Sequence, residues 1–228
     1  MTITLLELKT QCRERADMVN SNFISDSELT SYINSSIGEL YDIMIQSYGS
    51  DYFISTDEYD TVASQEDYSL PTDFYKLKGV DAKLNNDKYF AIKKFNFNER
   101  NRFDKFGVWS LLGIANIRYR LLGSNIRFTP VPDNETSIRL WYVPVAPKLS
   151  ADTDTLNDFN GYHEYVIVDA AIKMLQKEES DVSVLLQQKL MLKRRLEESS
   201  QNRDAGVPES VSDIYAENDD YSYWTSKG

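Results

Sequence analysis

The chain has 228 residues, 41% of them hydrophobic and 27% charged, and its 36 acidic residues against 25 basic ones give a formal net charge of −11. This composition is ordinary for a soluble globular protein of one large or two small domains, and it excludes collagen-like, disulfide-scaffold and fully disordered chains. The negative charge argues against a protein that binds nucleic acid over its whole surface. The sequence contains no run of about 18 apolar residues, so no membrane span is expected. Residues 1–4 lack the basic region that opens a secretory signal, so no such signal is expected.

Two helices with matching starts are predicted in residues 1–49. Thr4 with Glu7, and Ser25 with Glu28, both match the capping box S/T-x-x-E, in which each side chain bonds the other residue's free backbone N–H. Apolar residues at helical spacing follow each cap: Leu5, Leu8, Cys12, Ala16 and Val19, then Leu29, Ile33, Ile37, Leu40, Met44 and Tyr48. Gly49 stands where the second helix should end. The short link between the two predicts an antiparallel helical hairpin.

The pattern changes to period two between residues 50 and 150, where turn signals also recur. In residues 117–128, apolar residues alternate with arginines on either side of Gly123-Ser124, a two-residue hairpin turn. Residues 138–142 repeat the alternation and predict a third strand beside them. The segment is therefore expected to form an antiparallel β module with one apolar face and one basic face.

Helical spacing returns after Gly161 and predicts two further helices in residues 157–202. The acidic stretch 178–181 is expected to separate them, with one long kinked helix as the alternative. The first carries Tyr165, Val168, Ile172 and Leu175, and the second carries Val182, Leu185, Leu186, Leu190, Leu192 and Leu196.

Residues 203–228 carry six acidic residues against two basic ones, a net charge of −4, and no core pattern. Aromatic and aliphatic residues nevertheless gather there: Ile214, Tyr215, Tyr221, Tyr223 and Trp224. A solvated linker has no need of them, so we interpret the segment as an extended tail that docks on a partner or neighbouring chain and orders as it binds. The alternative is an arm that folds back onto its own subunit.

The fold class expected from these elements is α+β, with a four-helix core built from helical hairpins, an inserted antiparallel β module and an extended C-terminal tail. The first hairpin comprises residues 1–49, the β module 50–150, the helices that complete the core 157–202, and the tail 203–228.

Residue types that carry catalysis are sparse. The single cysteine, Cys12, and the single histidine, His163, cannot form a zinc site within one chain. Cys12 lies on an apolar stripe and is interpreted as a small buried hydrophobe, and His163 as a surface or interface residue, although a general base is conceivable. Residues 152–154 begin like a calcium loop but lack its later ligands and its glycine. We therefore expect no catalytic residue, cofactor or metal.

One group of basic residues stands out. Arg120 should lie opposite Arg127 across the Gly123-Ser124 turn, with Arg118 and Arg139 on the same face. Opposed like charges need a counter-charge, either carboxylates or nucleic-acid phosphate, so this face is a possible interface or DNA-facing surface.

A second basic patch is interleaved with aromatic residues. It runs from Lys93-Lys94 to Lys105 and includes Phe95, Phe97 and Phe103. It can be interpreted as a platform for single-stranded nucleic acid or as a loop that is anchored in a subunit interface.

The order of the elements resembles the head–tail adaptor (connector) proteins of tailed bacteriophages. Three stretches carry the resemblance: residues 23–34 (FISDSEL followed by YIN), the Y-x-L-P-x-D stretch at 68–74, and the late β-hairpin at 125–147. Together with the terminal helices they cover most of residues 1–200, whereas residues 90–115 match no pattern of the family.

The resemblance implies a structural virion protein without catalysis, assembled in the host bacterial cytoplasm. Copies would form a dodecameric ring that joins the portal protein to downstream tail proteins and extends the DNA channel, through which DNA passes without sequence-specific binding. The C-terminal tail would climb the portal. The alternatives are a nucleic-acid-binding module that uses the arginine face, and an acid/base hydrolase.

Overall fold

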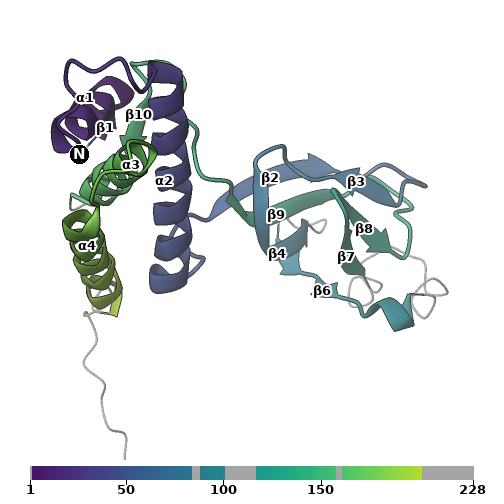
Figure 1. Ribbon diagram of the computed structural model, residues 1–228. Helices are drawn as coiled ribbons and strands as arrows, with labels where there is room; N and C mark the ends of the chain where they lie inside the picture. The colour runs from purple at the N-terminus through teal and green to yellow at the C-terminus, as the bar shows by residue number, and fades with distance from the viewer. Residues whose placement is uncertain (1, 84–87, 101–116, 158–160, 202–228) are drawn as a thin grey trace, which may run out of the picture.

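The computed structural model describes residues 2–83, 88–100, 117–157 and 161–201, and it confirms an α+β chain with four α-helices and antiparallel sheets. The helices and the two larger sheets lie at opposite ends of the molecule (Figure 1). The helices are α1 (Leu5–Arg15), α2 (Asp26–Tyr48), α3 (His163–Lys177) and α4 (Ser183–Gln201), with one 3₁₀ turn at Phe97–Glu99. The strands are β1 (Thr2–Thr4), β2 (Ser55–Asp60), β3 (Asp67–Ser69), β4 (Phe74–Lys83), β5 (Tyr89–Ala91), β6 (Lys93–Lys94), β7 (Arg118–Leu122), β8 (Asn125–Thr129), β9 (Ser137–Pro144) and β10 (Thr155–Asn157).

The helix caps follow the sequence signals closely. Thr4 and Glu7 form the full capping box of α1. Ser25 accepts the backbone N–H of Glu28 as expected, but the Glu28 carboxylate bonds Lys177 and Tyr32 instead of returning to the cap. That side chain therefore links α2 to α3 and does not close a second box.

The helix ends also agree with the sequence, with one exception. Gly49 caps α2 at a positive φ of 82°, and Glu179, at φ 58°, separates α3 from α4 and excludes the single kinked helix. Val19 was predicted to lie on the apolar stripe of the first helix. That prediction is wrong, because α1 ends at Arg15 and Val19 is 57% exposed.

One apolar cluster draws on all four helices. Its fully buried members include Leu5 and Leu8 of α1, Leu29 and Ile33 of α2, Val166 of α3, and Leu196 of α4 at 1% exposure. Helices α2 and α3 each contact the other three helices and are the central elements of this packing. The short β1–β10 pair closes the cluster beside α1.

A buried carboxylate sits where α2, α3 and α4 meet. Asp169 of α3 is 3% exposed and accepts hydrogen bonds from Ser36 of α2 (2.6 Å), from Lys173 one turn along α3 (2.7 Å) and from Lys189 of α4 (2.7 Å). Burial raises the pKa of Asp169, but these three donors outweigh it and lower the pKa below its ordinary value. Lys189 also reaches Glu39 of α2 at 2.9 Å, so one ammonium group joins three helices.

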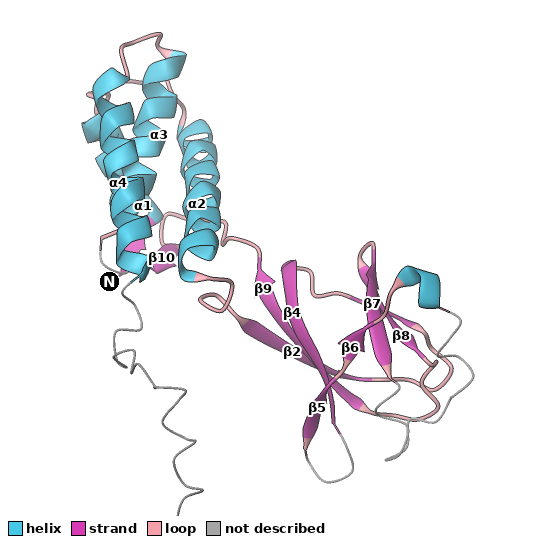
Figure 2. Cartoon of the chain, turned by 90° about the horizontal axis from the view of Figure 1, so that it is seen from below, coloured by secondary structure: helices cyan, strands magenta, loops and turns pink. Residues whose placement is uncertain are grey.

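Eight of the strands form two four-stranded sheets (Figure 2). A second apolar cluster draws its members from both of these sheets. One sheet has the order β2-β9-β4-β5 and the other β3-β8-β7-β6. Ile126 and Phe128 of β8, together with Ile138 and Leu140 of β9, are almost completely buried between the sheets. The expectation of purely antiparallel pairing is wrong at one edge, because β6 pairs with β7 in parallel.

The predicted three-strand meander is also wrong. Strands β7 and β8 do form the expected hairpin, with Arg120 opposite Arg127, but β9 pairs with β2 and β4 in the other sheet. The connection from β8 to β9 contains Pro130 and Pro132, which have no N–H to donate to a ladder, so the chain leaves one sheet there and enters the next. Gly123 adopts φ 61° at the first turn position, which suits a type II′ turn.

Helix α2 meets the sheets through a small aromatic contact. The Tyr41 ring stacks on Phe53 with centroids 4.0 Å apart, and its hydroxyl donates to the carbonyl of Pro144 at the end of β9 (3.1 Å). Val143 is fully buried against Tyr41 and Ile45. These contacts hold together the two segments in which the chain passes between helices and sheets, residues 49–54 and 144–149.

The Asp169 network predicts a large stability effect. Asp169→Asn should lower the free energy of unfolding by about 3 kcal/mol, because Lys173 and Lys189 lose a buried anionic partner. Chemical denaturation followed by circular dichroism measures it. The difference from the unaltered chain should shrink below about pH 4, since a lowered folded-state pKa adds stability only above the unfolded pKa and loses it as pH falls through the folded value.

A matched control lies on α4. Lys193 and Glu197 form an exposed pair at 3.9 Å, so Glu197→Gln should change stability by less than about 0.5 kcal/mol. Equal losses for the two variants would contradict the special role of Asp169.

Candidate functional site

His163, for which a role as a general base is conceivable, is the first residue of α3 and is partly exposed. Across the described parts of the chain, no three His, Cys, Asp or Glu side chains gather as a metal ion would require. Nor is any helix among those residues long and apolar enough to cross a bilayer.

The loop that begins like a calcium site uses its carboxylates locally. Asp154 accepts the backbone N–H groups of Ser150 and Ala151, and these bonds lower its pKa. Asp152 pairs with Lys9 of α1 at 2.7 Å. Both carboxylates therefore hold the chain that leads into β10.

Cys12 lies inside the helical cluster, as its place on the stripe predicted. Its side chain is fully buried, and burial raises the pKa of the thiol to about 12. A thiol in this state has almost no thiolate at neutral pH and is a poor nucleophile.

The arginines of the predicted basic face lie in both sheets. Arg118 and Arg120 are on β7 and Arg127 on β8, whereas Arg139 is on β9. The prediction that all four share one face is wrong, because β9 leaves the hairpin for the second sheet.

Two of these arginines are paired with carboxylates across their own sheets. Arg127 forms a two-pronged contact with Asp67 of β3 (2.7 and 2.6 Å), which lowers the pKa of Asp67. Arg139 bonds Glu58 of β2 at 2.5 Å and lies over the ring of Tyr89. The counter-charge expected for Arg127 beside Arg120 is thus a carboxylate of the same chain.

The second basic patch is only partly described. Lys93 and Lys94 are exposed, Phe95 is buried, and Phe97 is half exposed. Arg120 donates to the Phe95 carbonyl and lies over the Phe97 ring at 5.4 Å. Phe103 and Lys105 lie outside the described residues. The contacts within the described part of this patch therefore join β7 to the segment after β6.

The outer surface of α4 carries several exposed apolar residues. Leu185, Leu192 and Leu196 turn toward the helical cluster, together with the partly buried side chain of Lys189. The remaining apolar residues of the helix face solvent: Val184 at 73% exposure, Leu186 at 42%, Leu190 at 67% and Met191 at 72%. Gln187, Lys193, Arg194 and Glu197 flank Leu190 and Met191. We call these four exposed apolar residues the outer face of α4.

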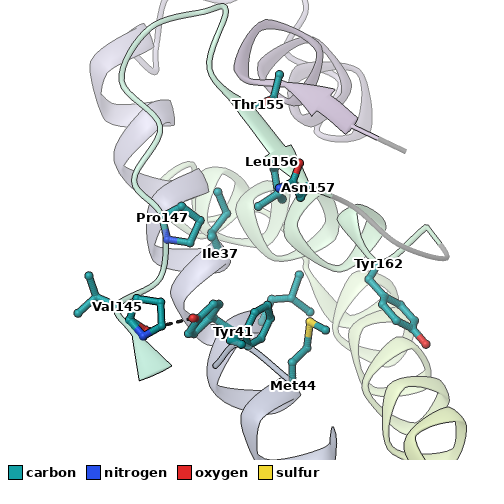
Figure 3. Close-up of a pocket in the computed structure, with 12 residues that line it drawn as sticks. Ile37, Tyr41, Met44, Val145, Pro147, Thr155, Leu156, Asn157 and Tyr162 are labelled. Carbon is teal, nitrogen blue, oxygen red and sulfur yellow. Dashed lines mark hydrogen bonds between the residues drawn. The ribbon is translucent and has the colours of Figure 1, made fainter. Parts of the chain in front are cut away.

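An apolar cavity of about 310 Å³ lies along α2 (Figure 3). Ile37, Tyr41 and Met44 of α2 form one wall, and residues 144–147 and β10 form the other. The lining also includes Phe53 and Tyr162. Thr155 and Asn157 provide its only polar side chains other than the tyrosine hydroxyls among the described residues.

The end of α4 is bonded to the wall of this cavity. The hydroxyl of Ser199 lies 2.6 Å from that of Tyr162 and 2.8 Å from that of Tyr48, and the two tyrosine hydroxyls are 2.9 Å apart. The chain therefore leaves its last described helix beside the cavity.

The predicted docking residues of the C-terminal tail lie outside the described residues: Ile214, Tyr215, Tyr221, Tyr223 and Trp224. Their role stays a prediction. Neither the cavity nor the outer face of α4 was predicted from the sequence. The second had a signal, because the leucines of residues 182–196 span a wider arc than one buried stripe needs.

The sequence also matches the model of a known protein family. A model described as SU10 adaptor protein matches residues 3–212, nearly the whole chain. No curated protein matches the sequence significantly.

Burial of Cys12 predicts its reactivity. In the native chain a thiol reagent such as DTNB should leave Cys12 unmodified, and one equivalent should react once denaturant unfolds the protein. Absorbance at neutral pH reports the reaction. Rapid labelling of the native chain would show that the helical cluster opens far more readily than its packing implies.

Proposed function

The chain belongs to the SU10 adaptor protein family, and we propose on this premise that copies of it form a ring that joins the portal to the tail and extends the DNA channel. As a member of this family the protein is a structural head–tail adaptor of a bacteriophage virion. The ring, its dodecameric number and its place under the portal are our proposal. So is assembly of the particle in the host bacterial cytoplasm.

The outer face of α4 is the observation that carries this proposal. A heterologous ring needs one surface on each copy that binds a different surface of the next copy. Val184, Leu190 and Met191 are each more than two-thirds exposed, and burying such side chains gains about 1.5–3 kcal/mol apiece. We propose that this face packs against the neighbouring copy.

In this arrangement the four helices and the sheets have different tasks. Residues 1–49 and 157–202 form the helical core that packs side by side in the ring, and residues 50–150 form an inserted β module that offers a platform to the next tail component. The contacts that support this division are the separate apolar clusters of the helices and of the sheets.

The electrostatics suit a channel that lets DNA slide. The net charge of −11 repels phosphate, whereas a basic wall would retain it. Because Arg127 and Arg139 are neutralised by Asp67 and Glu58, we favour passage of DNA without specific binding over a nucleic-acid-binding module.

The tail is proposed to reach the portal. Its aromatic residues, Tyr215 and Tyr221–Trp224, suit an extended segment that orders on a partner surface. The portal and the downstream tail proteins would then contact opposite ends of the ring.

Ring formation tests the role of α4. Met191→Glu should abolish rings, because a charge replaces an apolar side chain that the neighbour would bury. Negative-stain electron microscopy and mass photometry, with and without the cognate portal vertex, count the assembled particles. The monomer should keep its circular dichroism spectrum, since Met191 is 72% exposed.

The matched control is Val62→Glu. Val62 is 57% exposed and lies between β2 and β3, away from the helices, so this variant should assemble like the unaltered chain. Rings of normal yield from Met191→Glu would remove α4 from the interface. Failure of the unaltered chain to form rings on the portal vertex would overturn the ring itself.

Removing residues 203–228 tests the tail. The shortened chain should remain folded, because the described apolar clusters contain no residue beyond Leu196, but its attachment to the portal should weaken at least about tenfold. Co-sedimentation with portal particles measures the attachment. Equal binding by the full and shortened chains would refute the proposed contact.

A further inference from the structure

The apolar cavity along α2 lacks an occupant among the described residues, yet its walls are those of a binding site. Ile37, Leu40 and Met44 are almost fully buried within the fold and still border the open volume. About 310 Å³ is at the lower end of the range for ligand sites, which is enough for one large aromatic side chain and part of its neighbour. The cavity therefore suits a short apolar segment.

We propose that this cavity holds one aromatic side chain from the end of the same chain's C-terminal tail, Tyr221–Trp224, before the tail reaches a partner. The inference goes beyond the proposed function, because it concerns the free subunit. It makes the cavity an intramolecular docking site.

The position of α4 provides the first argument. Ser199 is hydrogen-bonded to Tyr162, and Tyr162 lines the cavity, so the chain enters the tail one side chain away from the site. Nineteen residues lie between Gln201 and Tyr221, and a flexible segment of that length has a root-mean-square span of about 25 Å. The tether is long enough to turn back, and it supplies an effective concentration on the order of millimolar. A weak contact is enough to fill the site.

The chemistry of the cavity provides the second argument. Tyrosine and tryptophan side chains need an apolar wall and one polar partner at its edge. Met44 and Phe53 supply the wall, while Thr155 and Asn157 supply polar side chains. The segment Tyr221–Trp224 carries three aromatic residues in four positions, whereas Ile214-Tyr215 offers one, so the former presents more side chains of the kind that the site accepts.

Charge supports the same occupant. Asp219 and Asp220 directly precede the aromatic cluster. Lys148 follows Pro147 of the lining, is exposed, and makes no ion pair with any described residue. An acidic pair that enters beside this lysine would gain a favourable charge contact.

Docking in the cavity gives the tail two alternative positions. The aromatic cluster would be sheltered in the free subunit and released when a partner surface binds it more strongly. Shelter of this kind limits association through exposed aromatic residues before assembly.

Disulfide trapping in the full-length chain tests the proposal. Val145 borders the cavity at 47% exposure, and Ser222 lies between Tyr221 and Tyr223, so Val145→Cys with Ser222→Cys leaves every aromatic residue in place. Mild oxidation should form an intrachain disulfide, whose formation requires Cα atoms less than about 7 Å apart. Native Cys12 does not compete, because it is buried and its pKa is about 12. Mass spectrometry of proteolytic fragments identifies the bond.

The matched control is Val62→Cys with Ser222→Cys, which places the partner thiol at a site of similar exposure between β2 and β3. Trapping at Val145 should be at least about tenfold faster than at Val62, and replacing Tyr221, Tyr223 and Trp224 by serine should reduce it to the control rate. Equal rates at the two sites, or a rate that the serine replacements leave unchanged, would overturn the proposal.

A concentration series separates the tail of the same chain from that of a second copy. The intrachain bond should form at a rate independent of protein concentration and give a product of monomer mass. Disulfide-linked dimers whose yield rises with concentration would assign the cavity to a neighbour's tail and refute the same-chain assignment. Because the measurement uses the free subunit, its result does not depend on whether rings form.

Discussion

The ion pairs of Asp169 hold the helical half of the molecule in one arrangement. A carboxylate that is 3% exposed survives inside the fold only because Ser36, Lys173 and Lys189 donate to it from three helices. The directions of these bonds fix how α4 is rotated about its own axis, since Lys189 must point inward. Leu185, Leu192 and Leu196 then follow Lys189 to the buried side, and the other apolar residues of α4 are left outside.

That rotation explains how one helix can serve two surfaces. A helix that covers a core needs one apolar stripe, whereas α4 has apolar residues both on the side that faces the core and on the side that faces solvent. The part that faces inward completes the subunit. The part that faces outward does not pack within the described fold, and it is available for contact between copies. Val184 and Met191 are its most exposed members.

Much of the local structure could be predicted from sequence. The caps at Thr4 and Ser25, the end of α2 at Gly49 and the Arg120–Arg127 register depend on residues a few positions apart, so local chemistry decides them. The sheet to which β9 belongs depends on contacts with β2 and β4, more than 50 positions away, and alternation alone cannot choose between partners. The burial of Asp169 could not be predicted for a related reason. A polar residue beside an apolar stripe is usually solvated, and only the packing of three helices around Asp169 removes it from water. The cavity likewise arises from α2, residues 144–147 and β10, which are distant in sequence.

The two chain crossings between helices and sheets have a mechanical consequence. Ser55 at the start of β2 lies opposite Tyr142 near the end of β9, so both crossings leave the sheet side by side. The stacked rings of Tyr41 and Phe53 and the bond from Tyr41 to Pro144 brace them against α2. Tension between the two halves is therefore shared by two parallel tethers, which pull β2 and β9 in the same direction from one end of their six-pair ladder, so neither strand is drawn past the other.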